Sequence, residues 1–442
     1  MNKFKELGLS QELFKTIETL GFEEPTQIQR KSIPFILQGK DVIGESATGS
    51  GKTLAFGCGI IEKVIPDNGL QALVLTPTRE LANQVKESLV QFSGNKKLSI
   101  ISVYGGVSIN TQIQNLPKAD VVVATPGRLL DHINRKTINM SKISFLVIDE
   151  ADRMFDMGFI RDIKKIMNIC PSERQTLFFS ATLAHKIKEL ADRYTKNPIV
   201  VFAEKMVDPE KLSQMYYDVL KNEKLSVLVH LLQNKKSNLV MVFCNTRRTT
   251  NAVAKNLRAN KIDAIEIHGG LSQYERTKNI ESFSSNKANV LVCTDVAARG
   301  LHISNVSHIY NYELPGDPND YVHRIGRTAR AGEEGSVINL LSNEDHRNFR
   351  MIIDKYRTFD IEKETVSHYK KITPMLINSY RGPRSYSGRN NPRGSYSNNQ
   401  NSCGNYRGYS DQNTRSNYGG HSEARSRTHG SNGMLLPNRR RF

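Results

Sequence analysis

Short apolar runs alternate with amphipathic stretches along residues 1–378 of the chain. The first half contains seven runs that we expect to form strands, at 41–45, 72–76, 99–103, 120–124, 145–149, 176–180 and 199–202. The second half repeats the pattern at 238–244, 263–267, 289–295, 308–312 and 336–341. Patterns typical of helices lie between most of these runs. Strands that alternate with helices indicate βαβ units and parallel sheets.

Two such sets of strands predict an α/β protein of two domains, each a parallel sheet flanked by helices. The 442 residues are enough to build two separate cores. The stretch 203–214 is polar, contains a proline and lacks a strand pattern, so we place a linker there. The expected boundaries are 1–205 for the first domain, 206–214 for the linker and 215–375 for the second domain.

Residues 376–442 differ in composition, and we expect them to form a disordered basic tail. From Ser379 to Phe442 there are 11 arginines, no lysine and two acidic residues, which gives +9 of the total charge of +18. Six tyrosines lie among them, with very few aliphatic residues, so little apolar surface can be buried. Arginine and tyrosine together can pair with phosphates and stack on bases, which favours additional contacts with nucleic acid. The alternative is a solubilising tail or a spacer.

The sequence also indicates the cellular compartment in which the protein is found. No apolar run approaches the length of about 20 residues that spans a bilayer, and the first residues do not resemble a secretory leader. The five cysteines are scattered without the C-x-x-C spacing of a zinc site or redox pair; they are Cys58, Cys170, Cys244, Cys293 and Cys403. This usage is typical of a reducing cytoplasm, so we expect no membrane association and a cytoplasmic protein.

The run 145–148 leads directly into three carboxylates, Asp149, Glu150 and Asp152. A polar turn is a normal end for a strand, and that explanation stays open for this stretch alone. A buried parallel strand, however, delivers its last residues to the carboxyl edge of the sheet, where ligands of α/β folds bind. A carboxylate at that edge can hold Mg²⁺, and a neighbouring carboxylate can act as a base.

The stretch 44–53 follows a predicted strand and opens a predicted helix, as a phosphate-binding loop does. Glycines let the backbone N–H groups face an anion, Lys52 reaches the β- and γ-phosphates, and the Thr53 hydroxyl binds Mg²⁺. Ser46 stands where glycine or alanine is usual. The residues expected to hold the phosphates of ATP are Ala47, Thr48, Gly49, Ser50, Gly51, Lys52 and Thr53. Such a loop needs a second strand that carries a carboxylate to the same Mg²⁺, and Asp149 meets that need.

"IDEAD" together with "ATGSGKT" resembles the DEAD-box RNA helicase family, whose members have two RecA-like domains. The resemblance covers about residues 4–332, and its motifs occur in order. They are "GFEEPTQIQ" (21–29), "PTREL" (77–81), Gly105–Gly106, "TPGR" (125–128), "SAT" (180–182), "VFCNT" (242–246), "HGGLSQYER" (268–276), "TDVAARGL" (294–301) and "HRIGRTAR" (323–330).

The resemblance implies how ATP is selected and hydrolysed. Gln29, whose amide can pair with both N6 and N7 of adenine, and Phe4, which can stack on the ring, would select ATP. Without the surrounding motif, the simpler explanation would be that Gln29 is an ordinary surface residue and Phe4 an ordinary core residue. Arg327 and Arg330 would act as arginine fingers, although an RNA-facing basic pair is the alternative. The catalytic residues expected are Lys52, Glu150, Arg327 and Arg330.

The resemblance also assigns residues to RNA and to the coupling between ATP and RNA. The coupling residues are Asp152, Ser180, Thr182, Asp295 and His323. The RNA-binding residues are Pro77, Thr78, Arg79, Gly106, Thr125, Gly127, Arg128, Thr246, Gly270, Gln273, Arg276 and Thr294. Small residues, backbone amides and arginines bind phosphates and sugars, so we expect little sequence preference, with RNA distinguished from DNA by its 2′-hydroxyls.

One position departs from the family pattern. His302 stands where an aspartate is usual after "RGL", and a change in ATP affinity, in coupling or in pH dependence is expected. The sequence therefore predicts an ATP-dependent RNA helicase that requires Mg²⁺, opens short duplexes locally and remodels RNA–protein complexes. The alternatives are an ATP-gated RNA clamp, a DNA-translocating helicase and a non-enzymatic RNA-binding scaffold.

Overall fold

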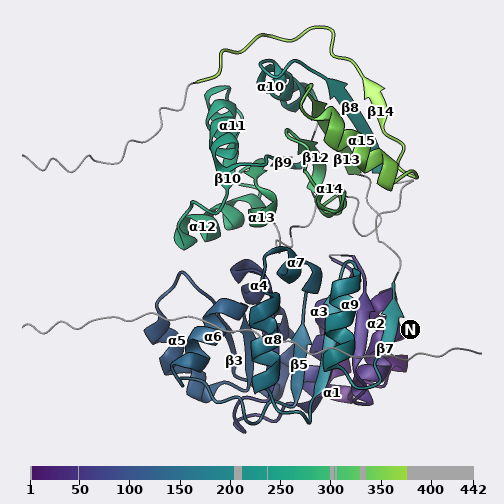
Figure 1. The fold of residues 1–442 in the computed structure, drawn as a ribbon, viewed down its shortest axis with the longest axis vertical. Helices are drawn as coiled ribbons and strands as arrows, with labels where there is room; N and C mark the ends of the chain where they lie inside the picture. The colour runs from purple at the N-terminus through teal and green to yellow at the C-terminus, as the bar shows by residue number, and fades with distance from the viewer. Residues whose placement is uncertain are drawn as a thin grey trace, which may run out of the picture. The chain divides into compact units, whose positions relative to one another are not determined.

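The computed structural model describes residues 2–47, 49–203, 212–235, 237–298, 303, 306–328 and 335–375. Three residues to which we assign a role from the sequence lie outside this part of the chain, as does the predicted tail from 376 onward; they are Thr48, His302 and Arg330. The described residues form two sheets of seven strands each, and every pair of neighbouring strands is parallel. The predicted fold class is confirmed (Figure 1).

The first sheet has the strand order β3-β4-β2-β5-β6-β1-β7. Its strands are β1 (Val42–Glu45), β2 (Ala72–Leu75), β3 (Ile100–Val103), β4 (Val121–Ala124), β5 (Phe145–Ile148), β6 (Gln175–Ser180) and β7 (Ile199–Phe202). Its helices are α1 (Gln11–Thr19), α2 (Gln27–Leu37), α3 (Lys52–Lys63), α4 (Arg79–Ser93), α5 (Ile109–Asn115), α6 (Pro126–Asn134), α7 (Ala151–Asp156), α8 (Ile160–Ile169) and α9 (His185–Tyr194).

The apolar runs form strands because both faces of this sheet are covered by helices. In β5, Phe145 and Val147 belong to one core, with residues of α1 to α4, whereas Leu146 and Ile148 belong to the other, with residues of α6, α8 and α9. All four are buried. A continuous apolar run, rather than alternation of apolar and polar residues, is what a strand buried on both faces requires.

The second sheet has the order β10-β11-β9-β12-β13-β8-β14. Its strands are β8 (Leu212–Asp218), β9 (Leu239–Phe243), β10 (Ala264–Ile267), β11 (Val290–Cys293), β12 (Val306–Asn311), β13 (Gly335–Leu341) and β14 (Glu362–Glu364). Its helices are α10 (Lys224–Asn234), α11 (Arg247–Ala259), α12 (Gln273–Ser284), α13 (Asp295–Ala298), α14 (Pro318–Ile325) and α15 (His346–Lys355). α10 and α11 pack on one face of this sheet, and α14 and α15 on the other.

Two strands of this sheet were not expected. β8 begins at Leu212, inside the range 206–214 that we expected to be linker, and residues 204–211 lie outside the described part of the chain. Gln214 of β8 is buried, and its side-chain oxygen is satisfied by a hydrogen bond from the Tyr321 hydroxyl at 2.8 Å. β14 is exposed along its whole length and owes its strand conformation to pairing with β8.

After β14 the chain continues as an extended segment past α10 toward α11 (Figure 1). Val366, Tyr369 and Ile372 pack against the core formed with α10 and α11. We refer to residues 362–375 as the strap.

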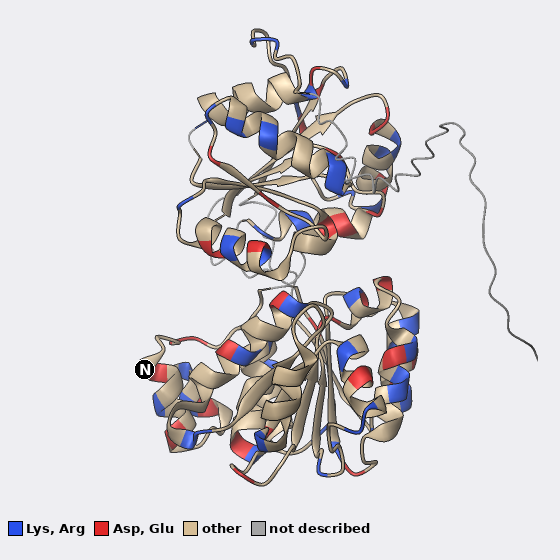
Figure 2. Ribbon diagram, turned by 90° about the vertical axis from the view of Figure 1, so that its left-hand side faces the viewer, with Lys and Arg blue, Asp and Glu red and all other residues tan. Residues whose placement is uncertain are grey.

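Charged residues lie mostly on helices and loops, whereas the central strands carry very few (Figure 2). Lysines and arginines are interspersed with aspartates and glutamates over the helices. Within the described residues, no helix is long and apolar enough to cross a membrane.

Candidate ATP and RNA site

Most predicted site residues of the first domain directly follow the carboxyl ends of its parallel strands, as ligand sites of open α/β sheets do. β1 leads into 46–53, β2 into 77–79, β3 into Gly106, β4 into 125–128, β5 into 149–152 and β6 into 180–182. The phosphate loop and the carboxylates are thereby brought to one edge of the sheet, because β1 and β5 both pair with β6.

The phosphate loop is held by its own side chains. Gly49 and Gly51 have positive φ angles of 85° and 89°, which other residues adopt at a cost. The Lys52 ammonium donates to the Ser46 carbonyl at 3.0 Å, and the Ser50 hydroxyl donates to the Ser46 hydroxyl at 2.9 Å. Ser46, the departure from the usual glycine or alanine, therefore stabilises the curled loop.

Asp149 is a buried carboxylate beside the phosphate loop, with only 2% of its surface exposed. Burial raises the pKa of Asp149 to about 7, against the lowering effect of the Lys52 charge, while Glu150 and Asp152 raise it further. Its Oδ1 accepts the backbone N–H of Glu150 at 2.9 Å. An anionic Asp149 needs further positive charge nearby, which is the environment that a divalent cation provides.

Glu150 has an unusual backbone and an unexpected partner. Its φ of 52° and ψ of 51° are left-handed, so the residue stands at the sharp turn between β5 and α7. Conformations of this kind in non-glycine residues are strained and cluster at functional sites. The guanidinium of Arg153, one helical turn further along α7, lies 3.4 Å from Glu150 Oε2. Both side chains are buried, with 1% and 3% exposed, so the two charges compensate each other away from water.

Gln29 and Phe4, expected to recognise adenine, take different positions. Gln29 lies against the phosphate loop: its amide nitrogen donates to the Gly51 carbonyl, and its amide oxygen accepts the Thr26 N–H. Phe4 is fully buried and packs edge-on against Phe22, with ring centroids 6.4 Å apart. The structure brings Gln29 to the site but places Phe4 in the core.

The coupling residues of the first domain contact one another through backbone groups. The Ser180 hydroxyl accepts the backbone N–H of Asp152 at 3.2 Å and donates to the Thr182 carbonyl at 2.8 Å. Ser180 thus contacts Asp152 through the backbone N–H of that residue. The Asp152 carboxylate is buried, and its Oδ2 lies 3.8 Å from His323 Nε2.

In the second domain, Asp295 is bound by Arg324, to which the sequence analysis assigns no role. The guanidinium forms two parallel bonds, from Nε to Oδ1 at 2.6 Å and from Nη2 to Oδ2 at 2.7 Å. It also donates to the side chains of Asn311 and Asn245, both at 2.9 Å. Arg324 is 1% exposed and thus joins α14 to the ends of three strands. Arg327 follows on the same segment and is also buried, with 3% exposed.

The predicted RNA contacts of the first domain lie at helix N-termini and on glycine. Thr78 caps α4, where its hydroxyl accepts the Leu81 N–H at 3.3 Å, and Thr125 is the N-cap residue of α6. Arg79 lies on Gly106 so closely that a Cβ there would be 1.9 Å from its Nη1. Helix N-termini and backbone amides favour phosphate groups.

The second domain repeats this design. Thr246 caps α11, its hydroxyl accepting the Thr249 N–H at 3.0 Å, and the Gly270 N–H donates to His268 Nδ1 at 3.1 Å. Arg276 of α12 forms a largely buried ion pair with Glu80 at 2.8 Å. Thr294 directly follows β11 and is buried.

Sequence reasoning overlooked Arg153, Arg324 and Glu80. Arg153 follows "DEAD" directly, whereas Glu80 lies within "PTREL" and Arg324 within "HRIGRTAR", so their place in or beside a motif was the one available signal. The partners of Arg324 and Glu80 become visible only when segments far apart in sequence are placed side by side, whereas the partner of Arg153 is three residues away.

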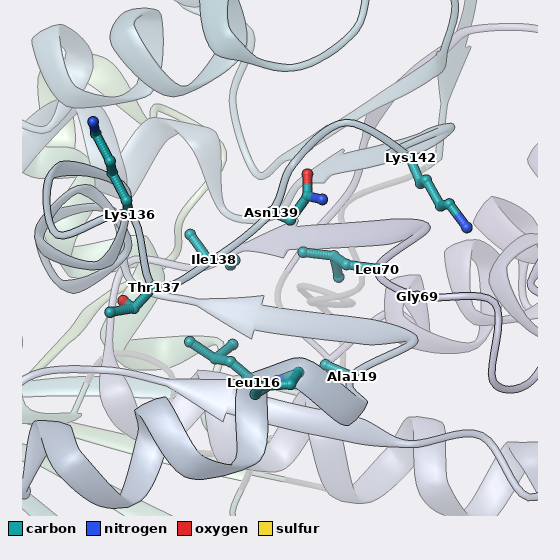
Figure 3. A pocket seen from close by; sticks show the side chains of 10 residues that line it. Gly69, Leu70, Leu116, Ala119, Lys136, Thr137, Ile138, Asn139 and Lys142 are labelled. Carbon is teal, nitrogen blue, oxygen red and sulfur yellow. The ribbon is translucent and has the colours of Figure 1, made fainter.

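A separate cavity of about 400 Å³ lies at the opposite edge of the first sheet. Leu70 and Ala119, just before β2 and β4, line it, with Lys136 and Lys142 at its two ends (Figure 3). None of the predicted site residues lines this cavity, so it is not part of the site.

Comparison with known proteins gives the class. A DEAD/DEAH box helicase model matches residues 26–190, and a helicase conserved C-terminal domain model matches residues 223–332. The DEAD-box ATP-dependent RNA helicase CshA of Geobacillus kaustophilus is 46% identical over 346 residues, which is 77% of this chain and 74% of the relative. The chain belongs to the DEAD-box family of ATP-dependent RNA helicases, and the predicted enzyme class is confirmed.

Solved structures agree with this assignment. S. cerevisiae Dbp5 bound to RNA and ADP BeF3 is 31% identical, with a TM-score of 0.76 over 83% of this chain and 96% of that chain. Mss116p bound to ssRNA and AMP-PNP is 28% identical, with a TM-score of 0.74 over 83% of this chain and 79% of that chain. The two-domain RecA-like fold is therefore confirmed.

Proposed function

We propose that this helicase binds ATP on the phosphate loop, opens short RNA duplexes locally and remodels RNA–protein complexes. The observation that carries the proposal is that the phosphate loop, which follows β1, and Asp149, which follows β5, lie at one edge of the first sheet, because both strands pair with β6. The Lys52 charge also lowers the pKa of this buried carboxylate. A phosphate-binding lysine beside such a carboxylate is the arrangement that nucleotide hydrolysis needs.

A small number of side chains carry out the hydrolysis of ATP. Glu150 orients a water and accepts its proton while the water oxygen bonds to the γ-phosphorus and the bond to the bridging oxygen breaks. Lys52 balances the phosphate charge, and Arg327 and Arg330 stabilise the charge that develops in the transition state. Arg153 supports the role of Glu150, because it fixes that carboxylate in a buried position.

The residues at this edge fit Mg²⁺. Mg²⁺ binds proteins through one or two carboxylates together with substrate phosphates, so Asp149 and the Thr53 hydroxyl would hold it. The raised pKa of Asp149 supports the assignment, because a buried carboxylate gains most from an adjacent cation. When bound, the ion would neutralise phosphate charge.

RNA would be held by its backbone. The predicted contacts are helix N-caps, glycines and arginines, which bind phosphates and sugars without reading bases. Dbp5 and Mss116p, both bound to RNA in their solved structures, support this proposal. The coupling residues Asp152 and His323, 3.8 Å apart, would link the ATP site to the second domain.

A cytoplasmic location is supported by the cysteines. Cys58, Cys170, Cys244 and Cys293 are buried and free, and burial raises the pKa of each thiol. Free thiols suit a reducing compartment.

The proposal is tested by measuring ATP hydrolysis and strand separation together. We expect RNA to stimulate hydrolysis and unwinding to fall steeply as the duplex lengthens, because strands are opened locally. Lys52→Ala should abolish both activities. Efficient unwinding of long duplexes would indicate translocation instead, and long RNA retention with negligible strand separation would indicate an ATP-gated clamp.

A further inference from the structure

α11 carries a one-sided basic stripe that no motif accounts for. Arg247, Arg248, Lys255 and Arg258 are all exposed, and no acidic residue occurs between Arg247 and Lys261. At 3.6 residues per turn, these four side chains fall within an arc of about 100°. We call them the α11 stripe.

The opposite side of the helix packs against the sheet. Thr250, Val253, Ala254 and Leu257 are buried there. The stripe therefore faces away from the core and contributes nothing to packing.

Three cations of the stripe form no ion pair with any described residue. Arg258 pairs with Glu266 at 2.5 Å, whereas Arg247, Arg248 and Lys255 pair with no described carboxylate. Like charges on one helix face repel each other and destabilise the helix slightly. Such a stripe is consistent with a surface that binds an extended anion.

One end of the stripe lies at the predicted RNA site. Thr246, a predicted phosphate contact, caps α11 immediately before Arg247. The Arg247 guanidinium lies against Gly269, where a Cβ would be 3.0 Å from its Nη2. From Arg247 to Arg258 the stripe runs about 16 Å along the helix, away from that site.

The other end lies beside the end of the strap. The Tyr369 hydroxyl donates to Glu223 at 2.7 Å, and the Ile372 N–H donates to the Ser226 hydroxyl at 2.9 Å. The Met375 N–H then donates to the Asn256 side chain of α11 at 2.8 Å. The strap is thus fastened to α11 at the point where the chain continues into a sequence with 11 arginines and two acidic residues.

We propose that the α11 stripe is a second RNA-binding surface, which holds the phosphate backbone of RNA extending from the core motifs toward the start of the arginine-rich sequence. It rests on RNA being the substrate of this helicase, and it lies outside every motif of the proposed site. The surface would bind phosphates without sequence preference, because its arginines and lysine are aligned along a helix face and form no pocket for bases.

The test neutralises Arg248 and Lys255, two of the stripe cations without an ion pair, with a matched control in the same domain. Arg248→Gln with Lys255→Gln alters the stripe. Arg347→Gln with Arg350→Gln removes the same charge from exposed positions of α15, on the other face of the sheet. Each full-length protein is titrated with a long oligouridylate and with one just long enough for the core motifs.

We expect the stripe variant to bind the long oligouridylate about three- to tenfold more weakly at low salt, since exposed charge pairs are individually weak. Its plot of log affinity against log salt should be shallower by about 1.4, for two lost phosphate contacts on a single strand. Binding of the short oligouridylate and ATP hydrolysis at saturating RNA should match wild type, and the α15 variant should match throughout.

Three results would overturn the proposal. Equal losses in both variants would mean that total charge, not the stripe, attracts RNA. Equal losses on the long and short strands would place Arg248 and Lys255 in the core site. Unchanged binding would make the stripe an ordinary solvated face. Thermal unfolding of each variant checks the fold, and RNA-stimulated hydrolysis by wild type checks separately that RNA is the substrate.

Discussion

The side-chain amide of Gln29 donates a hydrogen bond to the backbone carbonyl of Gly51, 3.0 Å away. Gly51 cannot be replaced without disturbing this contact, because a Cβ there would lie 2.2 Å from the amide nitrogen. The amide oxygen is also engaged, by the Thr26 N–H at 2.9 Å. Pairing with adenine would therefore exchange two bonds within the protein for two bonds to the base, and would release Gly51 of the phosphate loop.

Gln29→Ala should narrow the preference for ATP over GTP. Two neutral hydrogen bonds at about 1 kcal/mol each correspond to a loss of about 10- to 30-fold in discrimination. This discrimination is measured as the ratio of kcat/KM for ATP to that for GTP. Gln11→Ala, on the exposed start of α1, is the control. If wild type hydrolyses GTP as well as ATP, Gln29 does not select the base.

Glu150→Gln should abolish ATP turnover while leaving ATP and RNA bound, because the amide keeps the shape but cannot accept the proton. General-base catalysis contributes about 10²- to 10⁴-fold, so the loss should fall in that range or beyond. Hydrolysis and RNA retention are measured on the same sample, with Glu189→Gln on the exposed face of α9 as control. Turnover near the wild-type rate would remove Glu150 from the mechanism.

Arg153→Met should lower kcat with little change in the KM for ATP, because the Glu150 carboxylate loses its buried partner at 3.4 Å. Stability should fall by about 3 kcal/mol, the usual cost of leaving one charge of a buried pair uncompensated. Arg153→Lys should restore part of the rate. In a Glu150→Gln background, Arg153→Met should have no further effect on turnover, whereas a purely structural role would slow both backgrounds equally.

The elements predicted best are those whose signal is local. The apolar runs of β1 and β5 and the glycines of the phosphate loop could be located from the sequence, because both faces of the sheet are buried and the loop needs glycine at fixed positions. β14 carries no apolar residue and exists through its pairing with β8. The contact between Arg324 and Asp295 joins residues that share no local pattern. Neither β14 nor this contact could therefore be predicted from the sequence.

Asp345→Asn should destabilise the second domain by about 3 kcal/mol at neutral pH. Asp345 forms a buried ion pair with Lys224 at 2.6 Å and also accepts from the Ser342 hydroxyl at 2.6 Å. Urea unfolding measures the change. The matched control is Glu344→Gln, whose pair with Lys221 is exposed and should contribute far less to stability.

The ion pair between Asp345 and Lys224 also makes the stability of the fold depend on pH. Burial alone would raise the pKa of Asp345, but the bonds from Lys224 and Ser342 outweigh it, so the pKa lies below its ordinary value of 3.8. A lowered pKa in the folded state means that the pair stabilises the fold above pH 3.8 and that this contribution is lost as the pH falls through the lowered value. Wild type and Asp345→Asn should therefore converge in stability only under strongly acidic conditions. A constant difference down to the lowest pH would contradict the ion pair.

Ending the chain at Asn378 should weaken RNA binding while leaving nucleotide binding nearly intact. The removed sequence carries +9 of charge and six tyrosines, whereas every residue assigned to ATP lies before residue 331. Each arginine that contacts a phosphate releases counterions, so the loss should be largest at low salt, and the slope of log affinity against log salt should fall by about 0.7 for each contact on a single strand.

Replacing a few of the eleven arginines should weaken binding in proportion, because a segment with many similar basic residues offers interchangeable contacts. The decisive measurement is RNA affinity against salt for the full-length and shortened chains. A shallower slope for the shortened chain would assign the lost contacts to the tail. Parallel lines with equal intercepts would mean that the tail does not touch RNA, and its arginines would then serve protein partners or solubility.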